Sequence, residues 1–297
     1  MGLFGGGYAK PGPGVDKNAP KKKGIFLYIE IFIRKFWKII QTNLLYFLTS
    51  IPIIAIYYII APVTEEFIVG LLPADAVTSE VIQSAQMGFR SLFAIGLFTL
   101  WGSGPSTAAY TFIMRNFVRE QHSWIFSDFF SNLRENFKQG IVVAIIDVLV
   151  VFLATTALPF YFYNFTATNS AIWLVACYAI GLALLIYTFM HYYIYQMMIT
   201  FECSLSQLYR NAIIMAFAKL PMNIVFTILA LVLLFIPFLS PMFAVVASAV
   251  IWVSFIAFPI IFYTSRVIQK NFLDNMEKDS DEEEIEAICS DEVPKDE

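Results

Sequence analysis

Long apolar runs alternate with short polar segments along most of this chain of 297 residues. A helix needs about 20 residues to cross the hydrocarbon core of a bilayer, and six runs are about that long. They cover residues 39–62, 87–114, 141–163, 171–199, 222–240 and 242–264. Only Ser240 and Pro241 separate the last two runs, which therefore form two spans or one re-entrant hairpin. The pattern predicts an all-α polytopic transmembrane helical bundle of about six spans.

A different pattern precedes the third of these runs. Residues 125–138 place Phe129, Phe130 and Phe137 on one side of a helical period, and the polar residues, among them Lys138, lie opposite. Such a division is typical of a helix that lies along the membrane interface. We therefore predict an amphipathic interfacial helix over 125–138.

Two further segments repeat this pattern. Residues 204–219 have a similar apolar face, and Ser204 and Gln207 fit a capping box at its start. Residues 24–38 form a weaker copy, which together with the following span is about twice as long as one membrane crossing requires. We expect this long helix to bend before residue 43. Because each amphipathic segment precedes two spans, the sequence predicts three helical hairpins.

Basic residues concentrate in alternate connecting segments, which indicates the orientation. The first 38 residues hold eight lysines and arginines, whereas residues 63–86 hold none and carry acidic residues instead. Lysine and arginine recur in 115–140, in 200–222 and after residue 264, and they are absent from 164–170. Short loops rich in these residues stay on the cytoplasmic side. We therefore predict a multi-pass protein of the cytoplasmic (cell) membrane, with both termini in the cytoplasm.

Composition agrees with a membrane protein and separates the chain ends from its centre. Only 14% of the residues are charged, whereas soluble domains have about 25%. We expect a disordered basic segment over 1–23, a transmembrane helical domain over 24–272 and a disordered acidic tail over 273–297. For the tail, a specific docking peptide is the alternative interpretation.

Enzyme chemistry of the soluble type is not expected. The chain has two histidines, His122 and His191, and neither stands at a metal-ligand spacing. No glycine loop with a lysine resembles a phosphate-binding motif. We therefore predict no cofactor, no metal and no nucleic-acid partner, and we expect the lipid bilayer to be the principal surroundings.

Polar residues within the spans gather in the half of the membrane nearer the cytoplasm. Counting about 1.5 Å per residue, Asp147 and His191 lie at similar depths on consecutive antiparallel spans. A carboxylate at a helix centre costs about 2.5–3.5 kcal/mol, so Asp147 should be paired, protonated or in contact with water. We predict an Asp147–His191 pair, although a histidine here is also compatible with a hydrogen-bonded core residue. The complete candidate set is Asn43, Ser106, Thr107, Asp147, His191, Tyr195 and Asn223.

The stretch WGSGPSTAAY interrupts the second apolar run with small and polar residues. Gly102 with Ser106, and Gly104 with Ala108, have the small-xxx-small spacing that allows two helices to approach closely. Pro105 is expected to kink the span. The alternative is an opened helix that lines a ligand pocket, since broken helices are tolerated in membranes beside cavities.

Two blocks resemble the YesL family of bacterial membrane proteins. Residues 102–140, GSGPSTAAYTFIMRNFVREQHSWIFSDFFSNLRENFKQG, are similar to that family's pattern of G-P-A-T-A-A-L, a basic helix end, D-F-F and K-E-N-F-K-Q. Asn43, Leu44 and Leu45, followed by Pro52, look like its first span. Here the acidic outer segment separates the two blocks, whereas the family joins them almost directly. The resemblance implies a Gram-positive cell-membrane protein of undefined activity, encoded beside sugar ABC transporters and sensor kinases.

Two functions fit these observations. The first is an accessory or scaffold protein of carbohydrate uptake or its regulation, which docks transporter or sensor-kinase components through its amphipathic helices. The second is a small-solute or lipid transporter with a polar site in the inner half of the membrane. A transporter requires the polar residues within the spans, whereas a scaffold requires the amphipathic surface.

Overall fold

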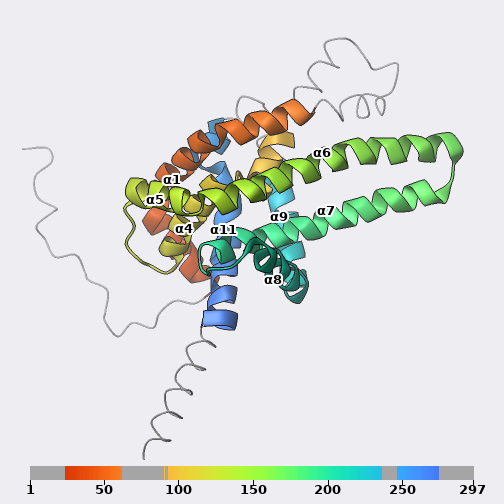
Figure 1. Ribbon diagram of the computed structural model, residues 1–297. Coiled ribbons are helices and arrows are strands. Elements are labelled where there is room, and N and C mark those ends of the chain that lie inside the picture. The colour runs from red at the N-terminus through yellow and green to blue at the C-terminus, as the bar shows by residue number, and fades with distance from the viewer. Residues whose placement is uncertain (1–23, 62–89, 91–92, 236–245, 274–297) are drawn as a thin grey trace, which may run out of the picture.

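The computed structural model describes residues 24–61, 90, 93–235 and 246–273, and all regular structure in these ranges is helical. The helices are α1 (Ile25–Ile60), α4 (Pro105–Val118), α5 (Ile125–Glu135), α6 (Phe137–Thr168), α7 (Ala171–Met198), α8 (Leu205–Ala218), α9 (Leu220–Phe235), the π-helix η4 (Ser248–Trp252), α11 (Val253–Ile268) and the π-helix η5 (Gln269–Leu273). They pack into a helical bundle (Figure 1), which confirms the predicted all-α fold. The predicted terminal segments lie outside the described residues, apart from Leu273.

Four of the described helices are long and apolar enough to cross a bilayer. They are α1, α6, α7 and the continuous stretch Ser248–Asn271, which contains η4 and α11. A fifth span results only if α8 and the following α9 count as one, and these two helices meet at 91°. The described part of the chain therefore has four or five candidate spans, compared with the six predicted. The missing one is the predicted second span.

The second apolar run is broken into two helical pieces. Residues 93–100 are helical, Gly102 and Gly104 have φ values of 91° and 71°, and α4 begins at Pro105. Positive φ is readily adopted by glycine, and a proline at the first helical position lacks only an N–H that a helix start leaves free. Pro105 thus starts a helix and does not kink one. The prediction of a continuous helix kinked at Pro105 is wrong, and the opened helix is observed.

The first span starts earlier than predicted. α1 is one helix of 36 residues that passes through position 43 without a break. Its first turns pack on α11, where the rings of Tyr28 and Phe32 have centroids 5.6 and 6.0 Å from that of Phe258. These ring contacts hold the start of α1 against the bundle. Residues 25–38 and the predicted span therefore form one unbroken helix, and no break separates them before residue 43.

The second hairpin consists of α6 and α7. Two residues, Asn169 and Ser170, connect the helices, and Asn169 adopts φ 50° at the end of α6. Figure 1 shows this hairpin extending well beyond the other helices. Large apolar side chains on it are exposed, such as Leu153 at 63% and Val175 at 63%. Lipid is the medium in which such a surface is stable.

One end of the bundle, here called the basic end, is where α4, α7 and α11 end and where α6 begins. Three polar contacts join the chain there: Arg115 Nη1 donates to the Ile199 carbonyl at 3.0 Å, Gln139 Nε2 donates to the Cys203 carbonyl at 2.9 Å, and Arg34 pairs with Glu120. Ser204 and Gln207 form the predicted capping box at the start of α8. These contacts join α4 to the end of α7, and they tie α1 and α6 to the segments that precede α5 and α8.

The predicted amphipathic helix over 125–138 is two helices. α5 ends at Glu135, and α6 begins at Phe137 after the single residue Asn136. Lys138 therefore belongs to the first turn of α6 and not to the helix with the phenylalanine pair. The prediction of one continuous interfacial helix is wrong at this point.

The three phenylalanines assigned to the interface do not share one environment. Phe129 is 0% exposed and packs in the hydrophobic core with residues of α1 and α4. Phe130 and Phe137 are 42% and 48% exposed, and Phe126, at 66%, is exposed beside them. The apolar side chains of α5 are thus divided between the core and the surface. Phe129 is a core packing residue and not a surface residue.

Candidate functional site

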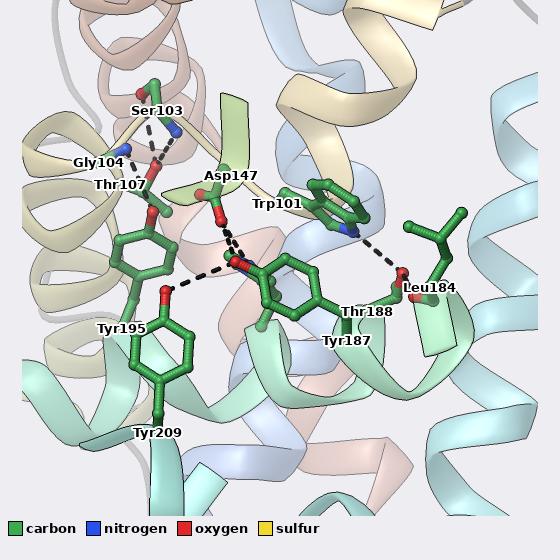
Figure 2. Close-up of polar contacts among 11 residues, drawn as sticks. Trp101, Ser103, Gly104, Thr107, Asp147, Leu184, Tyr187, Thr188, Tyr195 and Tyr209 are labelled. Carbon is green, nitrogen blue, oxygen red and sulfur yellow. Dashed lines mark hydrogen bonds and ion pairs between the residues drawn. The ribbon is translucent and has the colours of Figure 1, made fainter. Parts of the chain in front are cut away.

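A buried acid–base pair lies between α6 and α7. The side chains of Asp147 and His191 are both 0% exposed, and Asp147 Oδ1 lies 3.0 Å from His191 Nε2. The Tyr187 hydroxyl donates to the same carboxylate oxygen at 2.6 Å. Figure 2 shows Asp147 and Tyr187 pointing toward each other, with Tyr209 of α8 beside Tyr187. The contact between Asp147 and His191 that their matching depths predicted is therefore present.

This pair is close but incompletely hydrogen-bonded. The separation of 3.0 Å fits an ion pair, whereas neither nitrogen of the His191 ring has a partner in hydrogen-bonding geometry. Asp147 Oδ2 and the Tyr57 hydroxyl are also buried without a hydrogen-bond partner in the described structure. A buried polar group left in this way costs about 1–3 kcal/mol. The short distance shows an electrostatic contact between the two side chains. The polar atoms around it are buried without the hydrogen bonds that buried polar atoms in a protein core usually make.

Trp101, the last residue before the break, covers the histidine ring. Its indole stacks on His191 with ring centroids 5.6 Å apart and an interplanar angle of 12°. The indole N–H donates to Thr188 Oγ1 at 3.0 Å, which fixes the ring on α7 (Figure 2). The end of the first helical piece of span two is therefore part of the Asp147–His191 site.

The break itself is held by side chains that replace the missing helical hydrogen bonds. The Ser103 N–H donates to Thr107 Oγ1 at 2.6 Å, and the Gly104 N–H donates to the Tyr195 hydroxyl at 3.2 Å. A Cβ atom on Gly104 would lie 2.6 Å from the carbonyl oxygen of Gly140 on α6. The break thus requires glycine at position 104 for both its φ value and its contact with α6.

α1 contributes a further set of polar contacts to the break. The Tyr46 hydroxyl lies 3.0 Å from Thr107 Oγ1, and Ser50 Oγ lies 2.6 Å from Ser103 Oγ. Ser106 is directed to the α1 backbone, with its hydroxyl 3.4 Å from the Thr49 carbonyl. Thr107 and Tyr195 therefore belong to the region around the break, whereas Ser106 joins α4 to α1.

A small cavity lies where the break meets α7. It leaves about 60 Å³ for the centres of water-sized molecules. Its walls include Trp101, Gly102, Thr107, His191 and Gln196. Tyr46, Tyr110, Tyr192 and Tyr195 also line it, with apolar residues of α11. The opened helix therefore borders a cavity, as the alternative interpretation of WGSGPSTAAY required.

Asn43 of α1 lies apart from this cavity and bonds to η4 and to the start of α11. Its amide nitrogen donates to the carbonyls of Ser248 and Ala249, and its amide oxygen accepts from the backbone N–H and the hydroxyl of Ser254, all at 2.8 Å. A side chain inserted into a helical hydrogen-bond ladder is a known cause of a local distortion. The insertion accounts for the π-helical turn η4 at this point.

Asn223 is also buried and separate from the cavity. Its oxygen accepts from the Tyr193 hydroxyl at 2.8 Å, and its nitrogen donates to the Ala216 carbonyl at 2.9 Å across the sharp bend between α8 and α9. The prediction of one polar site that includes both asparagines is therefore wrong. Their depths are similar, but they face different helices.

Sequence reasoning missed Tyr187, Trp101 and Gln196. A signal for Tyr187 was present, because Tyr187, His191 and Tyr195 are spaced four residues apart and must share one face of a helix. Trp101 and Gln196 carried no such signal, since their roles depend on how the broken span meets α7. Among the described residues, no group of three or more histidine, cysteine or acidic side chains could hold a metal ion.

These features define a class: a multi-helix membrane protein with a buried acid–base pair beside a broken helix. A family model described as "Protein of unknown function, DUF624" matches residues 39–158, which include most of α1, the broken span, α5 and much of α6. Comparison with curated proteins and with solved structures gave no match.

Proposed function

We propose that this protein is an accessory or scaffold protein of carbohydrate uptake or its regulation, and not the permease itself. The observation that carries the proposal is the size of the cavity at the break, about 60 Å³. Pockets for small-molecule ligands are typically about 300–1,000 Å³. A sugar does not fit this space in the conformation described.

Other hollows of the described structure support the same proposal. A groove of about 340 Å³ between α6 and α7 is lined by apolar residues and by Tyr187, which suits a lipid tail better than a sugar. A surface hollow of about 560 Å³ lies on the outer side of α5 at the basic end. Its lining combines apolar, hydroxyl and charged groups: Phe126, Ser127, Phe130, Ser131, Arg134 and Glu135. The two phenylalanines and Arg134 in this lining are residue types that are enriched at protein–protein interfaces.

The orientation and the kind of partner come from the sequence. The lysines and arginines of the basic end support a position on the cytoplasmic side of the cell membrane, and we propose that both termini lie inside. The resemblance to YesL proteins favours components of a sugar ABC transporter or of a sensor kinase as partners. We propose that such a partner docks on α5 at the cytoplasmic face.

Removing two exposed phenylalanines from this hollow should release the partner. We expect Phe126→Ser combined with Phe130→Ser to abolish capture by a membrane-impermeant crosslinker added to inside-out vesicles, because the apolar contact is lost. Mass spectrometry of the crosslinked complexes is the measurement. A matched control combines Phe160→Ser with Tyr163→Ser, which are exposed near the opposite end of α6.

Two results would contradict the proposal. One is a double variant in α5 that accumulates normally and keeps every partner of the wild-type protein. The other is capture by the same crosslinker in intact cells and not in inside-out vesicles, which would place α5 on the outer side.

A small-solute or lipid transporter is the second candidate, and the unsatisfied polar atoms at the break favour it. Transporters use broken helices and buried ionisable residues at their binding sites. If the protein transports, Asp147→Asn should abolish flux at normal protein levels while partner capture remains. If it is a scaffold, the α5 double variant should impair uptake. Asp147→Asn should then leave uptake unchanged at normal protein levels, because no substrate site is lost.

A further inference from the structure

Two unsatisfied polar atoms belong to residues that line the same cavity. His191 Nδ1 and Gln196 Nε2 are buried without a hydrogen-bond partner in the described structure, and both residues form walls of the 60 Å³ cavity. A cavity needs about 10–15 Å³ of such space to hold one water molecule. The cavity is thus large enough for a few water molecules and too small for most other ligands.

The two atoms also have complementary chemistry. The amide nitrogen of Gln196 can only donate. Nε2 of His191 lies 3.0 Å from a carboxylate oxygen. A lone pair on Nε2 would repel that oxygen, so the electrostatic contact favours the tautomer with the proton on Nε2 and leaves Nδ1 as an acceptor. Water, which both donates and accepts, satisfies this combination, whereas a purely cationic or purely anionic ligand satisfies one half of it.

We propose that the cavity at the break of the second span is a water-filled proton-binding site, in which His191 accepts a proton from water held against Gln196. The site lies beyond the docking role proposed above. In the binding step, the lone pair of Nδ1 takes a proton from a hydronium ion in the cavity and leaves water, while the proton on Nε2 stays beside Asp147. The buried pair changes from a carboxylate beside a neutral ring to a carboxylate beside an imidazolium. The reverse step returns the proton to water.

The groups around His191 are suited to this exchange. Asp147 from α6 supplies the opposite charge at 3.0 Å. The other titratable groups facing the pair or lining the cavity are tyrosines: Tyr46 and Tyr57 of α1, Tyr110 of α4, Tyr187, Tyr192 and Tyr195 of α7, and Tyr209 of α8. The residues of α11 that line the cavity are apolar. Among these groups, the neutral imidazole of His191 is the one that carries a free nitrogen lone pair able to take up a proton.

Isotope-labelled histidine NMR of the full chain in lipid nanodiscs tests the proposal. The chain has two histidines, so the imidazole spectrum has two sets of signals, and His122→Gln assigns them. We expect the His191 signals to move reversibly between about pH 5 and pH 8, although the side chain is 0% exposed. Signals that stay fixed over this range would overturn the proposal, since they would describe a sealed core histidine.

A second variant tests the role of the cavity. Gln196→Leu removes the donor and makes the wall apolar, so we expect the pH response of His191 to be lost. The matched control is Gln139→Leu, which removes a glutamine at the basic end whose amide donates to Cys203, and which should leave the response unchanged. If His191 responds equally in the wild type and in Gln196→Leu, the proton does not arrive through this cavity. Thermal melting of each variant, measured beside the spectra, shows that it is folded.

Discussion

Gly140→Ala is expected to destabilise the protein, whereas Gly181→Ala is expected to stabilise it. Both glycines lie inside long helices, in which alanine is favoured over glycine by about 1 kcal/mol. A Cβ atom on Gly140 would lie 2.7 Å from the backbone nitrogen and 2.8 Å from Cα of Pro105, and neither atom can rotate away. Overpacking of this kind costs typically about 1–3 kcal/mol. Gly181 has no atom within 4 Å of the new methyl group.

Thermal melting of the purified variants in the same detergent is the measurement. The melting temperature of Gly140→Ala should fall below that of the wild type, and that of Gly181→Ala should equal or exceed it. If Gly140→Ala is as stable as Gly181→Ala, then α6 does not pack directly on the start of α4, and the described geometry of the break is wrong.

Asn43→Ala is expected to cause the other large loss of stability. The substitution leaves the carbonyls of Ser248 and Ala249 and the N–H of Ser254 without their partner, in a site where Asn43 is 0% exposed. Each buried group without a partner costs about 1–3 kcal/mol, so a loss of several kcal/mol is expected. The matched control is Asn164→Ala, because Asn164 is only partly buried and its amide donates to the Phe160 carbonyl within α6.

Denaturation of both asparagine variants in mixed micelles gives the comparison. Asn43→Ala should unfold at a clearly lower denaturant concentration than Asn164→Ala. Equal midpoints would mean that the hydrogen bonds of Asn43 do not hold α1 against η4.

The hydrophobic pattern predicted the class of fold because helix length and apolar composition are local properties. The hairpin of α6 and α7 follows from two apolar runs joined by a short polar turn, and the capping box of α8 follows from two residues. The outcome at the second run was not a local property. Gly102, Gly104 and Pro105 are compatible with a packed kink and with an opened helix, and the contact with Gly140 on another helix accompanies the opened form.

The candidate site could be predicted only in part for a geometric reason. Counting residues along a span gives the depth of a side chain in the membrane but not the direction in which it points. Depth alone placed Asp147 and His191 together correctly, since their helices are neighbours. The same argument wrongly added Asn43 and Asn223, which lie at similar depths and face other helices. Trp101 could not be placed beside His191 from the sequence, because its position depends on where the helix breaks.

The central claim is that the broken span and the hairpin of α6 and α7 enclose a coupled acid–base pair, and a double-mutant cycle tests it most directly. Asp147→Asn, His191→Gln and the double variant are compared with the wild type by the free energy of unfolding in one detergent. Removing one member of the pair leaves the other buried without its partner, which costs about 1–3 kcal/mol, and more when the remaining group is charged. We predict that the double variant loses less stability than the sum of the single variants, by at least about 1 kcal/mol. Strictly additive losses would contradict the claim.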